Sequence, residues 1–244
     1  MSEKDWFIDW FNTSYYHILY QNRNESEAKE FIINLMNHLE LESESNILDL
    51  ACGKGRHSKT LNELGFEVLG VDLSENSIIE AQKWSSDSLS FEVHDMRYKI
   101  ENRQFNAIFN LFTSFGYFDT FNENQLVCEA MHQMLEVGGK LVIDFMNVFK
   151  VISSLVREEE KKINEINFKI SRNHDDSHIF KHIKFVDQGN DYHFTERVQV
   201  LRLEDFQSLL EPYFIIEDVF GSLDLQPFIL EKSDRLIIIA SRKK

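Results

Sequence analysis

The sequence contains little glycine, proline or cysteine: 9 Gly, 2 Pro and 2 Cys among 244 residues. Collagen-like, linker-like and low-complexity proteins need Gly or Pro in bulk, so these classes are excluded. Cys52 and Cys128 form neither a disulfide framework nor a CxxC pair, which indicates a reducing compartment. No apolar run approaches the roughly 20 residues of a membrane helix, and the start, MSEKDWFIDW, is too polar for a signal peptide. We therefore expect a cytoplasmic protein.

Positive charge is also scarce. The chain has 26 Lys and Arg against 41 Asp and Glu, a formal net charge of -15. Binding to a nucleic-acid backbone depends on clustered cations, so we expect no nucleic-acid partner. Hydrophobic residues make up 43% of the chain and aromatic residues 13%, enough for a sizeable core. The length suits one large α/β domain with a modest insertion.

Apolar runs alternate with helical patterns over the first 150 residues. Thr120 and Glu123 have the spacing of a capping box, and we expect Gly138 and Gly139 to end the helix that follows it. Such alternation predicts a parallel sheet with helices on both faces. The expected strands are 46–51, 66–72, 88–95, 104–112 and 140–147, and the clearest expected helices are 25–41, 74–84 and 121–135.

The pattern changes after residue 150. Residues 155–201 predict an inserted antiparallel sheet, preceded by a charged helical stretch, VREEEKKIN. A helix at 203–210 and strands at 213–220 and 235–240 follow, and the absence of a helical period between the two strands makes the last one antiparallel. The expected fold is a Rossmann-like, doubly wound α/β sheet of seven strands with the last antiparallel. Residues 1–150 would form the lid and cofactor-binding part, 151–201 the insertion, and 202–244 the completion of the main sheet.

A Gly-x-Gly turn, Gly53-Lys54-Gly55, directly follows the first predicted strand. That place is the carboxyl edge of the sheet, where open α/β sheets bind ligands, and Asp72 at the end of the second strand is positioned to bind ribose hydroxyls. A dinucleotide fingerprint needs Gly or Ala where this chain has Ser58, and a P-loop needs a different glycine spacing. The pattern therefore favours a cofactor that carries adenosine but no pyrophosphate.

The segments ILDLACGKGRHS, VLGVDLS, VHDM, NLFTSFGYF and EVGGKLVIDFMN together resemble the class I S-adenosylmethionine-dependent methyltransferases. Within that superfamily the chain is most similar to small-molecule enzymes, including amino-sugar N-methyltransferases, which share a Tyr-rich leader and an extra antiparallel sheet. The resemblance implies S-adenosylmethionine as cofactor and methyl transfer to a small-molecule acceptor. An amine is one such acceptor. The missing Asn-Pro-Pro-Tyr type motif after the fourth strand disfavours exocyclic base amines.

The resemblance also assigns cofactor-binding residues, strand by strand. The loop after the first strand would surround the methionine part, the second strand would hold the ribose, the HDM segment the adenine, and the fourth strand the sulfonium. A leader segment would close over the cofactor. From its place in the first turn of the following helix, Arg56 either pairs with the cofactor carboxylate or faces solvent. In chain order the residues are Tyr15, Tyr20, Arg23, Asp49, Ala51, Gly53, Gly55, Arg56, Asp72, Leu73, Asp95, Met96, Asn110 and Leu111.

Methyl transfer needs alignment more than a dedicated base. If the acceptor is an amine, Tyr117, Asp144 and Asn147 at the carboxyl ends of the sheet are the candidates to assist it. His174, His178 and His182 recur every fourth residue in a segment that reads as strand and turn, and no metal is expected there. The insertion either shapes the acceptor pocket or forms a homodimer contact. A non-catalytic cofactor-binding regulatory protein and a nucleotide-linked oxidoreductase are the alternative functions.

Overall fold

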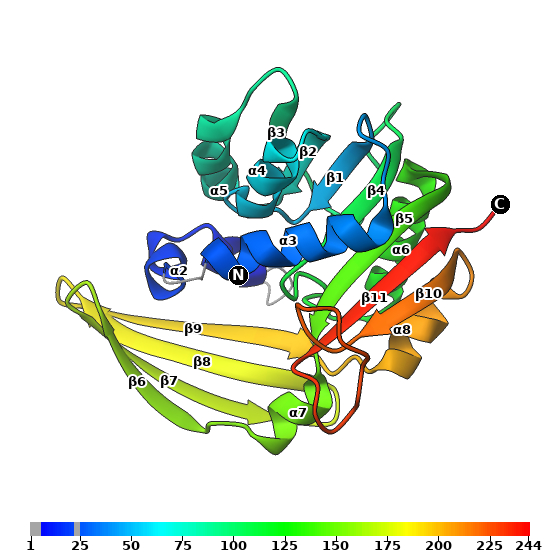
Figure 1. Ribbon diagram of the computed structural model, residues 1–244. Helices are drawn as coiled ribbons and strands as arrows, with labels where there is room; N and C mark the ends of the chain where they lie inside the picture. The colour runs from blue at the N-terminus through cyan, green and yellow to red at the C-terminus, as the bar shows by residue number, and fades with distance from the viewer. Residues whose placement is uncertain (1–5, 22–24) are drawn as a thin grey trace.

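The computed structural model describes residues 6–21 and 25–244. A seven-stranded sheet forms its centre, in the order β10-β11-β5-β4-β1-β2-β3 (Figure 1). Neighbours from β5 to β3 are parallel, whereas β11 runs antiparallel to both β5 and β10. The predicted fold class is confirmed. The strands are β1 (Asn46–Leu50), β2 (Glu67–Asp72), β3 (Leu89–Val93), β4 (Phe105–Asn110), β5 (Leu135–Met146), β10 (Phe214–Phe220) and β11 (Arg235–Arg242).

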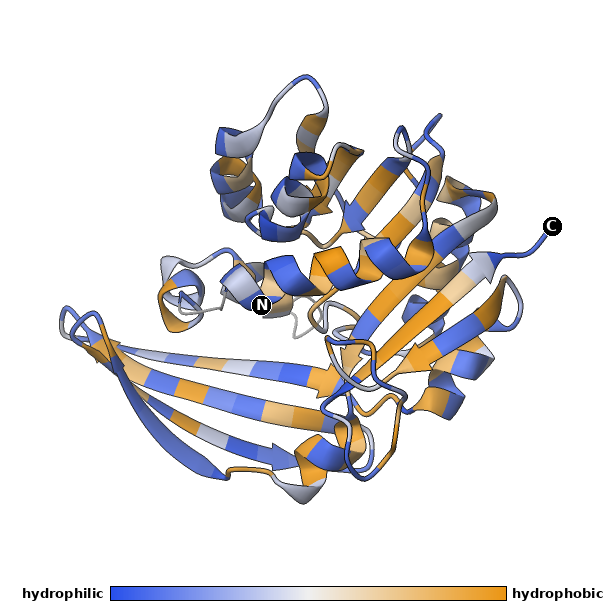
Figure 2. Cartoon of the chain, viewed as in Figure 1, coloured by the Kyte–Doolittle hydropathy of each residue, from blue (hydrophilic) through white to orange (hydrophobic). Residues whose placement is uncertain are grey.

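Helices cover both faces of this sheet because its central strands are apolar on both sides (Figure 2). Helices α3, α4 and α5 pack on one face, and α6 and α8 pack on the other. The predicted caps are present: the Ser74 side chain caps α5, and Thr120 with Glu123 forms the capping box of α6. The bounds are α3 (Glu25–Leu39), α4 (Arg56–Glu63), α5 (Glu75–Ala81), the 3-10 turn η2 (Gln82–Trp84), α6 (Phe121–Met134), α7 (Val148–Ser153) and α8 (Leu203–Leu210).

A separate antiparallel sheet, ordered β6-β7-β8-β9, curves below the main sheet in Figure 1. Its strands are β6 (Glu158–Ile163), β7 (Ile166–His174), β8 (His178–Asp187) and β9 (Asn190–Gln199). The short leader helices α1 (Trp6–Phe11) and α2 (Ser14–Leu19) pack on its apolar face, where Trp10 and Leu19 join Phe168 and Ile183 in one core cluster. No helix in the described parts of the chain is long and apolar enough to span a membrane.

The charged stretch VREEEKKIN was expected to be helical, and this prediction is wrong. Most of it is β6, which pairs with β7 from Glu158 opposite Ser171 to Ile163 opposite Ile166. The two-residue turn between them, Asn164-Glu165, has positive φ at both positions, the geometry of a type I′ hairpin. Pairing with a neighbouring strand therefore overrides the local helical preference of a Glu- and Lys-rich segment.

The glycine pair after α6 was also misplaced. The helix ends at Met134, and β5 begins at Leu135, so Gly138 and Gly139 lie inside the strand rather than ending the helix. The β4–β5 register shifts beside them, between Phe105 and Ala107. A Cβ on Gly139 would lie 2.9 Å from the backbone oxygens of Asn106 and Glu136. The pair thus accommodates an irregular strand pairing.

Candidate functional site

The loop between β1 and α4 crosses the carboxyl edge of the sheet and is fixed to the end of β2. The Gly53 N–H donates to Oδ2 of Asp72 at 2.9 Å, and the Ser74 N–H donates to Oδ1 of the same carboxylate at 2.8 Å. Ala51 and Gly53 both have positive φ, 65° and 57°. The predicted pair of a Gly-x-Gly turn and an acidic residue is therefore brought together, with Asp72 joining the loop to the next helix.

The two glycines of the turn meet different requirements. A Cβ on Gly55 would collide with the Phe91 ring at 2.6 Å, so this glycine is needed for packing. A Cβ on Gly53 would meet no atom within 4 Å. Gly53 therefore borders open space at the carboxyl edge, where a ligand can approach the backbone closely.

Two buried polar groups lie beneath this loop. Asp49 is 1% exposed and accepts a 2.5 Å hydrogen bond from Oγ of Ser58, and burial raises the pKa of its carboxyl to about 6. Asn110 is fully buried and donates through Nδ2 to the Leu50 carbonyl at 3.0 Å. Its Oδ1 has no hydrogen-bond partner among the residues that the structure describes. A buried acceptor without a protein partner leaves room for a donor from a water molecule or a ligand.

These groups fit S-adenosylmethionine, the cofactor that the sequence resemblance implies. Asp72 and the free oxygen of Asn110 are acceptors for hydroxyl or ammonium protons, and Gly53 leaves the space that a bound molecule needs. Leu73 follows Asp72 in the chain, and Sδ of Met96 lies 3.9 Å from Nδ2 of Asn110, so these two partly buried side chains supply apolar surface beside the acceptors; Leu111 is buried.

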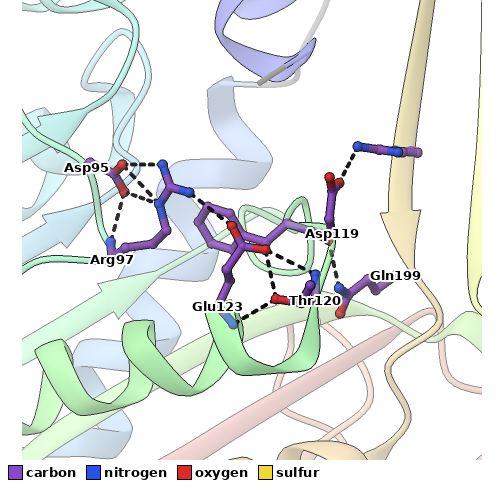
Figure 3. Close-up of polar contacts among 8 residues, drawn as sticks. Asp95, Arg97, Asp119, Thr120, Glu123 and Gln199 are labelled. Atoms are coloured by element: carbon purple, nitrogen blue, oxygen red, sulfur yellow. Dashed lines mark hydrogen bonds and ion pairs between the residues drawn. The ribbon is translucent and has the colours of Figure 1, made fainter. Parts of the chain in front are cut away.

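The Asp95 carboxylate lies within a polar network that reaches the capping box of α6 (Figure 3). Arg97 pairs with Asp95 at 2.6 Å and with Glu123, in the capping box of α6, at 3.1 Å. Next to this network, the Gln199 amide of β9 donates to the Phe118 carbonyl at 2.7 Å, and Arg197 forms an ion pair with Asp119. The segment from Phe118 to Glu123 therefore connects the predicted adenine region to β9.

The three leader residues named from the sequence differ in where the structure places them. The Tyr15 hydroxyl donates to Asp187 at 2.8 Å at the β8–β9 turn, and the structure does not bring it to the cofactor loop. The Tyr20 hydroxyl donates to Glu196 of β9 at 2.7 Å, and burial raises the pKa of Tyr20 well above its ordinary value. Arg23 lies outside the described residues.

The loop after β4 has an unusual backbone conformation. Asp144, one of the residues named from the sequence, supports it. Phe112 and Thr113 have φ of 60° and 59°, which non-glycine residues rarely adopt. Asp144, at the end of β5, accepts the Phe112 N–H at 2.8 Å through Oδ2 and Nε of Arg235 at 2.7 Å through Oδ1. Nη2 of Arg235 also donates to Oγ1 of Thr113 at 3.0 Å. Both oxygens of Asp144 are thus engaged in holding this loop.

The other two predicted catalytic side chains differ in their surroundings. Asn147 is 2% exposed and donates to the carbonyls of Leu230 and Ser233 at 2.7 and 2.8 Å, so its amide connects two chain segments. Tyr117 is partly exposed and contacts the rings of Trp6 and Phe11, with centroids 5.9 and 5.2 Å away. Of the two, Tyr117 is the one that faces the leader.

A cavity of about 600 Å³ opens between α3, the start of α4 and the carboxyl edge of the sheet. Arg56, Phe112 and Arg235 line it, with the Arg56 guanidinium 4.6 Å from the centroid of the Phe112 ring. The sequence did not single out Phe112 or Arg235. Arg235 reaches this edge only because β11 runs antiparallel, so that its first residue lies beside the end of β5.

Comparisons with known proteins agree with this geometry. Residues 41–199 match a family model described as a methyltransferase domain. The chain is 37% identical over 114 residues to YqeM of Bacillus subtilis, covering 46% of each protein. It is 30% identical over 131 residues to dTDP-3-amino-3,4,6-trideoxy-alpha-D-glucopyranose N,N-dimethyltransferase of Streptomyces venezuelae, covering 53% of this chain and 54% of the relative. The match thus spans about half the length of these curated relatives.

Among solved structures, an S-adenosylmethionine-dependent methyltransferase from Clostridium acetobutylicum superposes with a TM-score of 0.79. The two are 20% identical, and the superposition covers 94% of this chain and 96% of the other. At that identity the likeness shows the fold, over nearly the full length of both chains.

Proposed function

Because the chain belongs to the methyltransferase domain family, we propose that it is an S-adenosylmethionine-dependent methyltransferase that acts on a small-molecule amine. The observation that carries the proposal is the combination of Asp72 and the unpartnered Oδ1 of Asn110 around the open side of Gly53.

In the proposed complex, Asp72 accepts the ribose hydroxyls, Leu73 and Met96 contact the adenine, and Asn110 and the loop from Ala51 to Gly55 hold the methionine part. When bound, S-adenosylmethionine supplies a methyl group on a positively charged sulfur, already activated for transfer. The protein then has to hold the acceptor nitrogen in line with that methyl group, an alignment that contributes roughly 7 to 11 kcal/mol.

An amine is proposed as acceptor because the Streptomyces venezuelae relative is named as an amino-sugar N,N-dimethyltransferase.

We assign cofactor binding to residues 1–150, acceptor binding to the inner face of the insertion at 151–201, and support of the sheet to 202–244. The outer face of the antiparallel sheet then remains for a homodimer contact. Cys52 and Cys128 are buried and free of disulfides, which supports a cytoplasmic enzyme. The net charge of -15 supports the absence of a nucleic-acid partner.

Among the three residues proposed to assist catalysis, the roles differ. Tyr117 is proposed to contact the acceptor. Asp144 is proposed as a positioning residue, because its carboxylate already accepts the Phe112 N–H and the Arg235 guanidinium. Asn147 is proposed to hold the segment around Leu230 next to the site.

Calorimetric titration tests the cofactor part of this proposal. The folded protein is expected to bind S-adenosylmethionine and to leave NAD unbound, and Asp72→Ala is expected to lose most of the affinity. Asp87→Ala, at an exposed residue, serves as the matched control. Methyl transfer to amines and to their hydroxyl counterparts, followed by mass spectrometry, then tests the acceptor class. A folded protein that releases no heat with S-adenosylmethionine would refute the methyltransferase proposal.

A further inference from the structure

Arg97, in the loop that follows β3, joins two carboxylates from different parts of the chain. Its backbone N–H, Nε and Nη2 all donate to Asp95, at 3.0, 3.0 and 2.6 Å. Its Nη1 donates to Glu123 at 3.1 Å, so the guanidinium lies between the two acids (Figure 3). The side chains of Asp95, Arg97 and Glu123 are 18%, 19% and 28% exposed, and the group is thus partly shielded from water.

Glu123 holds the outer end of Arg97 on a fixed element. The same carboxylate accepts the Thr120 N–H at 3.1 Å and Oγ1 of Thr120 at 2.9 Å, in the capping box that begins α6. The Arg97 guanidinium also lies 4.9 Å from the centroid of the buried Phe118 ring. Because the planar guanidinium binds an acid on each side, its position at the start of α6 sets the orientation of the Asp95 carboxylate.

The loop after β3 starts next to the proposed ribose site. Val93, the last residue of β3, is in register with Asp72 at the end of β2, and the His94 N–H donates to the Asp72 carbonyl at 3.0 Å. The Tyr98 N–H closes the following turn by donating to the Asp95 carbonyl at 3.0 Å. Asp72 and Asp95 therefore follow one another along the carboxyl edge of the sheet, at the ends of neighbouring strands.

The Asp95 carboxylate keeps capacity for one more hydrogen bond. A carboxylate has about four lone-pair sites, and three N–H groups of Arg97 occupy three of them. At 18% exposure the side chain remains within reach of a ligand. An ionised carboxylate can only accept, and the N–H donors of an adenine base are those of its 6-amino group. The remaining site thus suits a 6-aminopurine.

We propose that Arg97 is a positioning residue that fixes Asp95 to accept a hydrogen bond from the 6-amino group of the cofactor, so that base selectivity depends on Arg97. The role rests on the proposed function, in which the bound cofactor carries adenosine. Without the guanidinium, Asp95 loses two side-chain donors and turns toward solvent, so the amino group loses a partner that was already in place. An arginine that only stabilised the fold would instead affect every ligand of the site equally.

The probes are S-adenosylhomocysteine and its analogue with hydrogen in place of the 6-amino group. Calorimetry gives both affinities, and their ratio is the readout. The parent is expected to bind the amino compound about tenfold or more tightly, because the analogue lacks a hydrogen bond to a charged group. Arg97→Gln is expected to lower this ratio to below about threefold, since the Asp95 carboxylate is no longer held. Arg103→Gln breaks the more exposed Arg103–Glu92 pair and serves as the matched control, with the ratio of the parent.

Two further variants separate positioning from stability, with melting temperatures measured for all of them. Arg97→Lys keeps the positive charge but lacks the planar fork, so it is expected to melt closer to the parent and still show the lowered ratio. Adding Arg97→Gln to Asp95→Ala is expected to change the ratio no further, because Arg97 acts through Asp95. A further change in the double variant would contradict that order of action.

The possible failures are distinguishable. An unchanged ratio in Arg97→Gln and Arg97→Lys, or affinities for both compounds that fall by the same factor, would overturn the positioning role. Equal binding of the two compounds by the parent would overturn recognition of the 6-amino group by Asp95 and leave the proposed function intact. A folded parent that binds neither compound would count against the proposed function and, with it, the role of Arg97.

Discussion

Arg235 donates a 2.7 Å hydrogen bond from Nε to Oδ1 of Asp144, across 91 residues of sequence. Asp144 is 2% exposed and Arg235 is 20% exposed at its side chain, so the pair is largely shielded from water. It supports the two left-handed residues Phe112 and Thr113 in the loop after β4. Backbone strain of this kind costs of order 1 to 3 kcal/mol per residue and persists only where the surroundings hold it.

Removing one member of this pair is expected to be costly for stability. Asp144→Ala leaves the Arg235 guanidinium and the Phe112 N–H without their acceptor, and we expect the free energy of unfolding to fall by about 3 kcal/mol. Glu217→Ala breaks the more exposed Lys140–Glu217 pair and is expected to cost less than about 1 kcal/mol. Urea denaturation measures both, and equal losses would contradict a special role for Asp144.

Substitution by Asn separates positioning from base catalysis at Asp144. Asp144→Asn keeps the shape of the side chain but weakens its hold on Arg235, so kcat is expected to fall. If the carboxylate only positions the loop, the pH dependence of kcat keeps the shape seen in the parent enzyme. A pH profile that loses one limb in Asp144→Asn would assign the proton-accepting role to Asp144 instead.

Gly53 and Gly138 provide a matched pair to test the proposed cofactor site. Both have positive φ, 57° and 78°, and a Cβ on either would meet no atom within 4 Å. An alanine at either position is therefore expected to cost about 1 kcal/mol of stability. Only Gly53→Ala is expected to weaken S-adenosylmethionine binding in calorimetry, because its methyl group enters the cofactor space. The same affinity in both variants would show that Gly53 does not face the cofactor.

Burial of Asp49 predicts a pH-dependent stability. Its pKa is about 6 in the folded protein against 3.8 ordinarily, so the folded state binds the extra proton and stability falls as pH rises from about 4 to 6. Asp49→Asn removes this cost, and we expect it to gain up to about 3 kcal/mol over the parent at pH 7.5 and little at pH 4. Urea denaturation at both pH values, with Asp87→Asn as the exposed control, measures it. A gain independent of pH would contradict the assignment to Asp49.

The hairpin turns of the antiparallel sheet offer a stability comparison away from the site. Asn164-Glu165 and Gln188-Gly189 are both two-residue turns with positive φ at each position, but only the second has glycine. Glu165→Gly is expected to stabilise the protein by about 0.5 to 1 kcal/mol, and Gly189→Ala to destabilise it by a similar amount. Thermal melting measures both, and destabilisation by Glu165→Gly would show that contacts of the Glu165 side chain outweigh backbone strain.

The sequence by itself determined the order of the main elements and the place of the Gly-x-Gly loop at the carboxyl edge of the sheet. Apolar periodicity, the caps at Ser74 and Thr120, and the Gly-x-Gly turn followed by Asp72 are local signals, and they act over a few residues whatever the rest of the chain does. They were sufficient for the doubly wound sheet and the antiparallel last strand, whereas the hydrogen bond from Gly53 to Asp72 came only from the structure.

Only the tertiary structure decided what depends on partners distant in sequence. Residues 158–163 become a strand because β7 pairs with them, and Gly55 is required by a ring that arrives from β3. Asp144 became a loop support only when β11 brought Arg235 beside it, and Phe11 contacts Tyr117 only because the leader folds back against the β4 loop. Hydrogen bonds and ring contacts of this kind join segments whose proximity no local pattern encodes.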